Sequence, residues 1–361
     1  MKSLKIIPKL QKPKLQKPKT ILFGIKNPNH MCYMISILQM LFSVKEFTEY
    51  ILDNKFFFDN LKEIYGEKGK LEKITKDYYF FYLNEILMSI NRVKNINNFM
   101  YFFETKNKIG NMFTITRQND AGEFLEYFLN DLHNEFYRIE NYIHSKVRVK
   151  DIEKQESFIS YYFQINNSII IKPPSQDQSA EYVMIPEDIE RDTHYKPNDY
   201  LLNIPIYKIN KKINLQDLIS IELAPEIIHE TTSIEKNSIM KRKITSLPKY
   251  LIIRILRFKF KGDDVDETII KIPKSINIYD RYYDIISIVC YEGSGSGGHY
   301  TTYSERNDEW YYFNDSSVTK TCLTDVFKDV SSSGKPYIIL CRLVDLFKRF
   351  KPIDKRMLIG D

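Results

Sequence analysis

The sequence has few cysteines, and they are widely separated. Four occur in 361 residues, and no two of them form a C-x-x-C pair: Cys32, Cys290, Cys322 and Cys341. Small secreted domains rely on dense disulfides, and structural zinc sites are usually built from closely spaced cysteine pairs. The spacing argues against both, so we expect no bound metal or other cofactor and a reducing compartment, cytoplasmic or nuclear.

Long apolar runs are also missing. No uninterrupted run approaches the roughly 18 residues of a membrane span, and the first residues lack the apolar core of a signal peptide. General disorder is excluded in turn, because 43% of the residues are hydrophobic and 14% are aromatic. We therefore expect a soluble, intracellular, folded protein that does not bind a membrane.

An excess of one charge sign is confined to the N-terminus. Residues 1–20 carry seven lysines and no acid, which leaves 46 basic and 47 acidic residues, a net −1, over residues 21–361. A broad nucleic-acid groove needs clustered basic residues, so we do not expect the body to bind nucleic acid. Repeated prolines and like charges predict an extended, disordered basic tail. Its removal should have little effect on a site in the body, because screened charges on such a tail contribute little to a distant site.

Helical and β-prone segments divide the rest of the chain. Apolar residues recur at helical spacing from about 31 to 136, and short β-prone runs appear from about 156 onward. Helices first and sheet second is typical of an α+β fold, with a cleft expected where the two lobes join. We expect one domain over 21–361, with a helical lobe over about 21–136 and a β-rich lobe over about 137–361. The β-prone runs are 159–165, 168–171, 250–260, 283–290, 300–303, 310–313 and 337–341.

Two of the predicted helices are clear. Residues 121–136 place an apolar stripe at three- and four-residue spacing, and Asp120 with Glu123 gives the capping-box arrangement before it. Residues 32–42 are apolar nearly all round, so this second helix must be buried. Cys32 lies in its first turn.

The position of Cys32 favours a reactive thiol. A helix N-terminus presents unpaired N–H groups and a partial positive charge, which stabilise the thiolate that acts as a nucleophile. The turn-like residues 24–29 precede it, and the Asn27 side chain is a donor for an oxyanion formed at the thiol. An inert buried cysteine is the competing interpretation.

A thiolate nucleophile needs a base, and His299 is the candidate among six histidines. It follows the glycine-rich residues 293–298 and opens a β-prone run, which resembles a mobile gate beside a site. The alternative is an ordinary glycine-rich hairpin connection. The other five, at positions 30, 133, 144, 194 and 229, have ordinary polar neighbours and are expected at the surface or in packing.

The register of two neighbouring strands predicts a third residue that acts with Cys32 and His299. The runs 299–305 and 310–316 flank a turn, and a two- or four-residue loop pairs 305 with 310. Because strand side chains alternate between faces, Asn314 then lies on the face of His299 and Asp315 on the other. Asn314 is therefore predicted to orient the imidazole. An odd loop length would reverse the choice and favour Asp315.

Five segments together resemble one family, the ubiquitin-specific proteases. Residues 24–39 read GIKNPNHMCYMISILQ and resemble the family's cysteine box. Residues 117–124 read RQNDAGEF and are similar to its Q-Q-D-A-x-E-F segment. Residues 247–258 match its L-P-x-x-L segment and the R-F that follows, 298–315 resemble its histidine box, and 337–340 its closing strand. The segments occur in family order from residue 24 to about 342.

The resemblance implies a papain-like fold of thumb, palm and fingers, and cleavage of the isopeptide bond after the C-terminal glycine of ubiquitin. It implies that Cys32 is the nucleophile, His299 the base and Asn314 the orienter, with Asn27 the oxyanion donor. Ubiquitin and ubiquitinated proteins are the implied partners. Asp120 and Glu123 match acidic residues that bind the arginines of the ubiquitin tail. The further substrate contacts predicted from the matching segments are Gln118, Gly298 and Tyr300.

Departures from the family pattern leave two alternatives. Asn29 replaces a glycine, which is tolerable if the backbone there needs a positive φ, and His30 and Met31 replace the common Asn-Thr. These changes allow a catalytically silent ubiquitin-binding scaffold. The fingers usually carry two C-x-x-C pairs, but residues 136–246 contain no cysteine. The fingers are therefore expected to be reduced and zinc-free, which allows a protease for another ubiquitin-like modifier.

Overall fold

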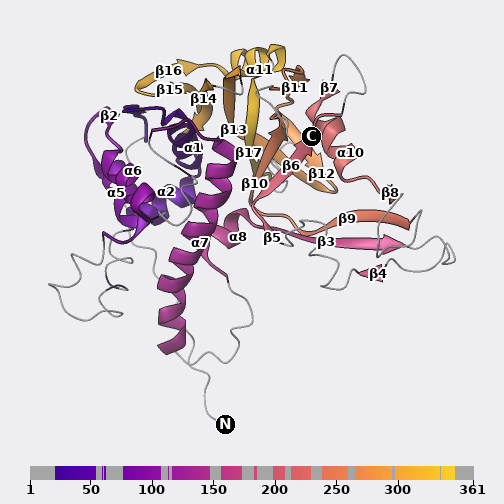
Figure 1. Cartoon of the computed structure of the whole chain (residues 1–361), viewed down its shortest axis with the longest axis horizontal. Helices are drawn as coiled ribbons and strands as arrows, with labels where there is room; N and C mark the ends of the chain where they lie inside the picture. The colour runs from indigo at the N-terminus through magenta and orange to yellow at the C-terminus, as the bar shows by residue number, and fades with distance from the viewer. Residues whose placement is uncertain are drawn as a thin grey trace, which may run out of the picture.

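A helical lobe lies beside a large sheet, and a narrower sheet projects from it in the computed structural model (Figure 1). The structure describes residues 21–53, 59, 61, 76–106, 113, 116–146, 156–172, 183–184, 198–207, 213–228, 238–258, 265–294, 297–333 and 335–345. The predicted basic tail, residues 1–20, lies outside the described residues.

The helical lobe, here the thumb, is built from the first helices of the chain. Its members are α1 (Cys32–Leu41), α2 (Lys45–Leu52), α5 (Tyr79–Met88), α6 (Asn97–Lys106), α7 (Ala121–Lys146) and α8 (Phe158–Phe163). All ten residues of α1 are buried, as their apolar character on every side predicts. The predicted stripe at 121–136 forms the first part of the longer helix α7. None of the described helices is long and apolar enough to cross a membrane.

The large sheet, here the palm, forms the second lobe. Its order is β16 (Ser317–Thr321), β15 (Glu309–Asn314), β14 (Gly297–Arg306), β13 (Arg281–Ser294), β17 (Pro336–Leu343), β10 (Tyr250–Leu256) and β6 (Leu201–Pro205), with β12 (Ser275–Ile278) also pairing with β13. Neighbours are antiparallel except for β10 and β6, which run parallel.

The narrower sheet, here the fingers, extends from the junction of the two lobes (Figure 1). Its order is β4 (Val183–Met184), β3 (Ile165–Lys172), β9 (Ser238–Ser246) and β8 (Glu226–Ile228), with β5 (Asn198–Asp199) pairing with β3. Two short parallel pairs complete the strands: β1 (Gly24–Ile25) with β2 (Val93–Lys94), and β7 (Ile213–Asn214) with β11 (Ile270–Lys271).

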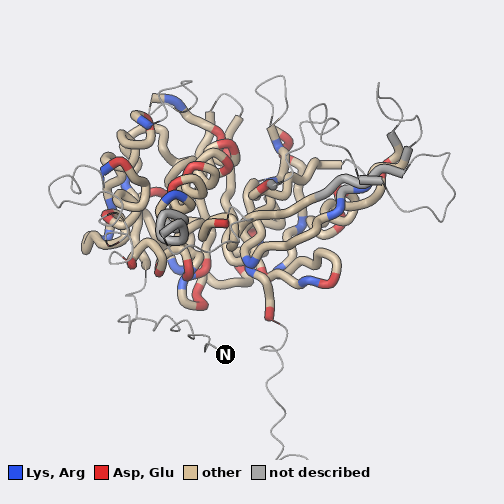
Figure 2. The backbone as a smooth tube through the Cα atoms, turned by 90° about the horizontal axis from the view of Figure 1, so that it is seen from below, with Lys and Arg blue, Asp and Glu red and all other residues tan. Residues whose placement is uncertain are grey.

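The palm is covered on both faces, so two hydrophobic cores form. Along β10, Ile252 packs with the thumb helices, whereas Leu251 and Ile253 pack on the opposite face. That opposite face is covered by α10 (Leu215–Glu222) and α11 (Leu323–Ser332). Alternation along a strand produces both cores, because successive side chains point to opposite faces of a sheet. Figure 2 shows acidic and basic residues mixed along the described chain.

One predicted strand is wrong. The run 159–165 is rich in aromatic and β-branched residues, but residues 158–163 form the helix α8. Ser157 begins it with a capping box, in which its Oγ accepts from the Ser160 N–H and the Ser160 Oγ accepts from the Ser157 N–H. This reciprocal cap, together with the burial of Ile159 and Phe163 against the thumb, outweighs the β propensity of the segment.

Candidate active site

Cys32 is the first residue of α1 and is almost completely buried, at 2% exposed. The helix packs against β14 and α7, so its N-terminus lies where the two lobes meet. No side chain caps the first turn of the helix. The loop before it is held instead by Asn27, whose Oδ1 accepts the Met31 N–H at 3.0 Å.

His299 on β14 lies between Cys32 and Asn314. Its Nε2 donates to Asn314 Oδ1 at 2.8 Å, because a carboxamide oxygen can only accept. The other ring nitrogen, Nδ1, is then left for the Cys32 side chain, which hydrogen-bonds the imidazole. This bond is the largest cause that raises the pKa of His299 to about 9; the Asn314 bond adds to it, while burial opposes it. The arrangement can therefore take the thiol proton and keep it on the ring.

The strand register that selects Asn314 is confirmed. Residues 305 and 310 are partners, and a two-residue turn at Asn307 and Asp308 joins the strands. Both turn residues have positive φ, 51° and 64°, as a hairpin turn of this length favours and as Asn and Asp tolerate. The even loop length brings Asn314 to the face of His299.

Asp315 follows the last residue of β15, has a positive φ of 49°, and holds the loop before Cys32. Its Oδ2 accepts from Asn27 Nδ2 at 3.1 Å, and its backbone oxygen accepts the Ile25 N–H at 2.8 Å. Burial raises the pKa of the Asp315 carboxyl, although the bond from Asn27 opposes that shift. The close approach of β1 to the turn after β15 requires glycine at position 24, because a Cβ there would lie 2.1 Å from the Ser316 backbone oxygen. One amide hydrogen of Asn27 is thus committed to Asp315.

The left-handed residue in the loop before Cys32 is His30 rather than Asn29. Asn29 does not have a positive φ, whereas His30 has φ 41°. The sharpest part of the loop therefore falls at His30. An imidazole side chain tolerates the left-handed region better than most, so a glycine at position 29 is not required.

The described part of the glycine-rich segment before His299 is paired strand. Gly293 pairs with Gly298 and Ser294 with Gly297. Gly298 is needed because a Cβ there would lie 2.4 Å from the Tyr291 ring. The hairpin alternative fits this part of the chain.

Gln118, predicted as a substrate contact, instead bridges the two lobes beside His299. Its Nε2 donates to the Gly298 oxygen at 2.5 Å, and its Oε1 accepts the Gly298 N–H at 2.7 Å. Both polar ends of the amide are occupied by one backbone residue. A substrate that contacted Gln118 would have to break this clasp, so its position favours support of the histidine strand.

The acidic pair at the start of α7 combines a cap with an exposed carboxylate. Asp120 Oδ1 accepts the Glu123 N–H at 2.8 Å, the forward half of the predicted capping box, and the Tyr337 hydroxyl donates to the same carboxylate. Glu123 is exposed as a residue, but its carboxyl group is partly shielded from water. This partial desolvation and the nearby Asp120 charge raise its pKa, while Arg254 opposes the shift. Tyr300 is 4% exposed and packs among aromatic rings, so its burial is at odds with a direct substrate contact.

Sequence reasoning missed a buried polar cluster that joins the cysteine helix to the histidine hairpin. Arg306 at the end of β14 donates to the Gln39 oxygen of α1 at 2.5 Å, to Gln39 Oε1 at 3.3 Å and to the Ile21 oxygen at 3.2 Å. Gln39 Nε2 in turn donates to the Phe23 oxygen at 2.8 Å. A single buried arginine does not stand out in the alternating pattern of a strand. The only hint of this cluster in the sequence is that alternation places Arg306 on an inward-facing position.

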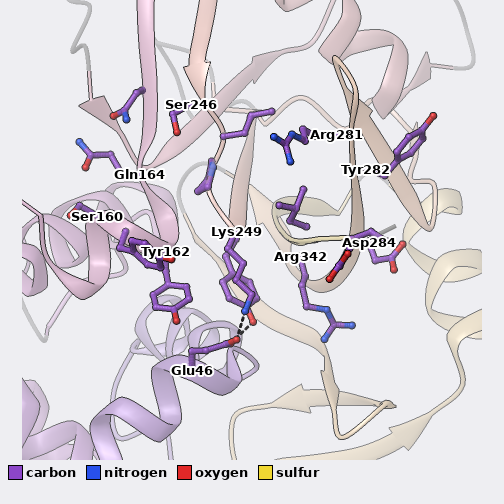
Figure 3. Close-up of a pocket in the computed structure, with 18 of the residues that line it drawn as sticks. Glu46, Ser160, Tyr162, Gln164, Ser246, Lys249, Arg281, Tyr282, Asp284 and Arg342 are labelled. Atoms are coloured by element: carbon purple, nitrogen blue, oxygen red, sulfur yellow. Dashed lines mark hydrogen bonds and ion pairs between the residues drawn. The ribbon is translucent and has the colours of Figure 1, made fainter. Parts of the chain in front are cut away.

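A large pocket lies at the end of the palm strands that is opposite to His299. It has a volume of about 1110 Å³ and is lined by the thumb helices α2 and α8, the start of β10 and the end of β17. Glu46 there pairs with Lys249 and accepts from the Tyr250 hydroxyl at 2.5 Å (Figure 3). The described residues hold no group of three His, Cys, Asp or Glu side chains able to bind a metal ion.

Comparison with known proteins identifies the family. A family model described as ubiquitin carboxyl-terminal hydrolase matches residues 23–340. The chain belongs to this family. Among curated family members, "Probable ubiquitin carboxyl-terminal hydrolase 4" of Schizosaccharomyces pombe is 26% identical over 367 residues, covering 91% of this chain and 60% of that protein. Human ubiquitin carboxyl-terminal hydrolase 2 is 25% identical over 337 residues, covering 82% of this chain and 52% of that protein. The chain thus spans about half to three fifths of these family members.

Solved structures of the family confirm the fold. A structure of the yeast SAGA DUB module has a TM-score of 0.67 and 18% identity, covering 94% of this chain and 71% of that one. The SAGA DUB module bound to monoubiquitin has a TM-score of 0.66 and 19% identity, covering 91% and 71%. The expected α+β fold with thumb, palm and fingers is therefore the fold of this chain.

Proposed function

We propose that the protein is a cysteine-dependent deubiquitinase that hydrolyses the bond after the C-terminal glycine of ubiquitin. The observation that carries this proposal is the hydrogen-bonded series of Cys32, His299 and Asn314, in which the imidazole joins the thiol to the amide. Family membership supplies the substrate class. A structural relative bound to monoubiquitin supports it as well.

The first chemical step forms a thioester. His299 Nδ1 takes the Cys32 proton, and the thiolate sulfur attacks the carbonyl carbon of the ubiquitin glycine. The carbonyl oxygen becomes an oxyanion, which the second Asn27 amide hydrogen and the Cys32 backbone N–H stabilise. The C–N bond then breaks, and His299 gives its proton to the leaving amine.

The second step restores the enzyme. Water loses a proton to His299 and attacks the thioester carbon, and the C–S bond breaks to release the ubiquitin carboxylate and the Cys32 thiol. Asn314 holds the imidazole in the tautomer that both steps require. Asp315 acts one residue further away: by accepting from Asn27, it aims the remaining amide hydrogen at the oxyanion.

We place the ubiquitin tail beside the N-terminus of α7. Glu123 is exposed there, so its carboxylate can pair with an arginine of the tail. Asp120 already accepts from Tyr337 and from the Glu123 backbone, and therefore contributes mainly by fixing that helix end. Glu123→Gln should accordingly weaken tail binding more than it changes stability.

A ubiquitin derivative with a C-terminal electrophile tests the proposal. The wild-type chain should form a covalent adduct, and Cys32→Ala should form none. Failure of the folded wild-type chain to react, or reaction of the alanine variant, would contradict it. Parallel probes made from other ubiquitin-like modifiers distinguish a different modifier as substrate, and binding without any adduct identifies a silent scaffold.

A further inference from the structure

An exposed apolar patch lies beside the loop that precedes Cys32. Twelve large hydrophobic side chains are exposed in the described part of the chain, and four of them occur at residue 22 and within 88–93. These four, here the β2 patch, are Leu22 at 37%, Met88 at 57%, Ile90 at 98% and Val93 at 44% exposed. Exposed apolar side chains that gather in one place mark interaction surfaces, whereas scattered ones need no explanation.

The backbone that carries the patch is firmly held. The Lys94 ammonium donates to the Ser89 oxygen and lies 4.7 Å from the centre of the buried Phe23 ring. Gly24 N donates to the Arg92 oxygen at 3.0 Å, which joins β2 to β1. Ile90 is therefore displayed on a loop that is tethered at both strands.

The two short strands separate an inner face from an outer one. Phe23, Ile25 and Lys94 are buried at 6%, 0% and 4% exposed, and they alternate with Leu22 and Val93 on the outer face. The inner face is thus already packed. The buried positions therefore provide most of the packing of these strands, and the outer apolar side chains provide less of it.

Sheet order determines on which side of the active site the patch lies. Tyr337, which holds Asp120 at the proposed tail site, is on β17, and His299 is on β14 two strands away. The next strand in the same direction is β15. The turn after β15 packs on Gly24 of β1, and β1 pairs with β2. A substrate that enters from the Asp120 side therefore leaves the catalytic groups towards β1 and β2. Figure 1 shows β2 beyond α1, at the far side of the thumb from the fingers.

We propose that the β2 patch binds the acceptor protein, and specifically the second ubiquitin of a chain, whose lysine is released by cleavage. The inference rests on the proposed function, since only an enzyme of that kind has an acceptor on this side. Lys26 and Arg92 are exposed at the rim of the patch. The acceptor surface is therefore expected to be apolar at its centre and acidic at its edge.

Two substrates that differ only in the leaving group test the proposal. One is ubiquitin with a C-terminal fluorogenic dye, and the other is a set of diubiquitins covering all linkages. Ile90→Asp should lower kcat/KM by about tenfold for at least one diubiquitin that the wild type cleaves, mainly through KM, because a central apolar contact is lost. Cleavage of the dye substrate should stay within about twofold, and Ile90→Leu should retain diubiquitin cleavage.

A matched control is Ile269→Asp, which places the same change at another exposed isoleucine, 49% exposed, outside the patch. It should leave both substrates unaffected. An unchanged rate for every diubiquitin with Ile90→Asp, or an equal loss for dye and diubiquitin, would overturn the acceptor role. An effect that disappears when residues 1–20 are deleted would overturn it too, because the occupant would then be this chain's own N-terminus. A wild type inactive on the dye would instead contradict the proposed function.

Discussion

The palm joins the thumb through two different kinds of junction. Along the histidine strand β14, Arg306 at the strand end is 5% exposed and donates to backbone and amide oxygens of α1, while Gln118 clasps Gly298 near the strand start. At the start of β10, Lys249 pairs with Glu46 of α2 beside an open pocket, and the Glu46 and Lys249 side chains are 25% and 43% exposed. One junction is dry and bonded to carbonyl groups, and the other is ionic and wet.

This difference shows which junction fixes the catalytic geometry. Hydrogen bonds from a buried cation to carbonyl oxygens are strong and poorly replaced by water, so they hold one arrangement. An exposed ion pair contributes little and can exchange its partners for solvent. The structure therefore concentrates its rigidity along the contact between the cysteine helix α1 and the histidine strand β14, and leaves the pocket junction free to adjust.

The largest expected effect comes from breaking the dry junction. Arg306→Met should lower the free energy of unfolding by about 3 kcal/mol, because Gln39 would keep buried oxygens without a donor. Urea unfolding measures this loss. At a temperature where the variant is still folded, reaction of Cys32 with the ubiquitin electrophile should also slow, since the cysteine helix and the histidine hairpin lose their common anchor.

Arg257 offers a matched control for that variant. It is 1% exposed and donates to the Pro336, Asp266 and Thr268 oxygens, none of which belongs to α1 or to the histidine hairpin. Arg257→Met should destabilise the protein by a similar amount and leave the Cys32 reaction rate of the folded protein nearly unchanged. An equal slowing in both variants would mean that Arg306 acts only through global stability.

The next effect concerns the pH range of activity. A pKa of His299 of about 9 means that the imidazolium is present below that pH and is lost as the pH rises through it, so kcat/KM should fall on the alkaline side near pH 9. The Asn314 bond helps to raise this pKa. Asn314→Ala should therefore move the alkaline limb to lower pH and reduce kcat/KM at neutral pH by about 100-fold.

Asn314→Asp separates the charge from the geometry at this position. An aspartate accepts the same Nε2 hydrogen bond and adds a negative charge, so the alkaline limb should move to higher pH. The pH profiles of kcat/KM for the wild type, Asn314→Ala and Asn314→Asp are measured with the dye substrate, which has no acceptor protein. A limb that does not move in either variant would show that another group controls it.

Local patterns predicted the fold class and nominated the residues that meet at the thiol, and the family resemblance decided between these residues and their inert alternatives. Cys32 starts a helix that is apolar on all sides, and an even turn length selects Asn314, so a few neighbouring residues decide each position. The Gln118 clasp and the Arg306 anchor join residues 180 and 267 positions apart, and no local period reports them. The helix α8 was misassigned because the cap formed by Ser157 and Ser160 outweighs the propensity of the residues that follow.

The smallest effect is expected at the pocket end. The pKa of Glu46 is lowered: burial alone would raise it, but hydrogen bonds from Lys249 and Tyr250 outweigh burial. A carboxyl with a lowered folded pKa contributes stability above its ordinary value of 4.5 and loses it as the pH falls through the folded pKa. Glu46→Gln should therefore cost at most about 1 kcal/mol at pH 7, since the pair is partly exposed. Between pH 7 and pH 3.5 the stability of the variant should also decrease less than that of the wild type, as measured by urea unfolding.

Turnover of the dye substrate by Glu46→Gln should stay within about twofold. A larger loss of turnover would show that the ionic junction also sets the position of the thiol, which would remove the distinction between the two junctions.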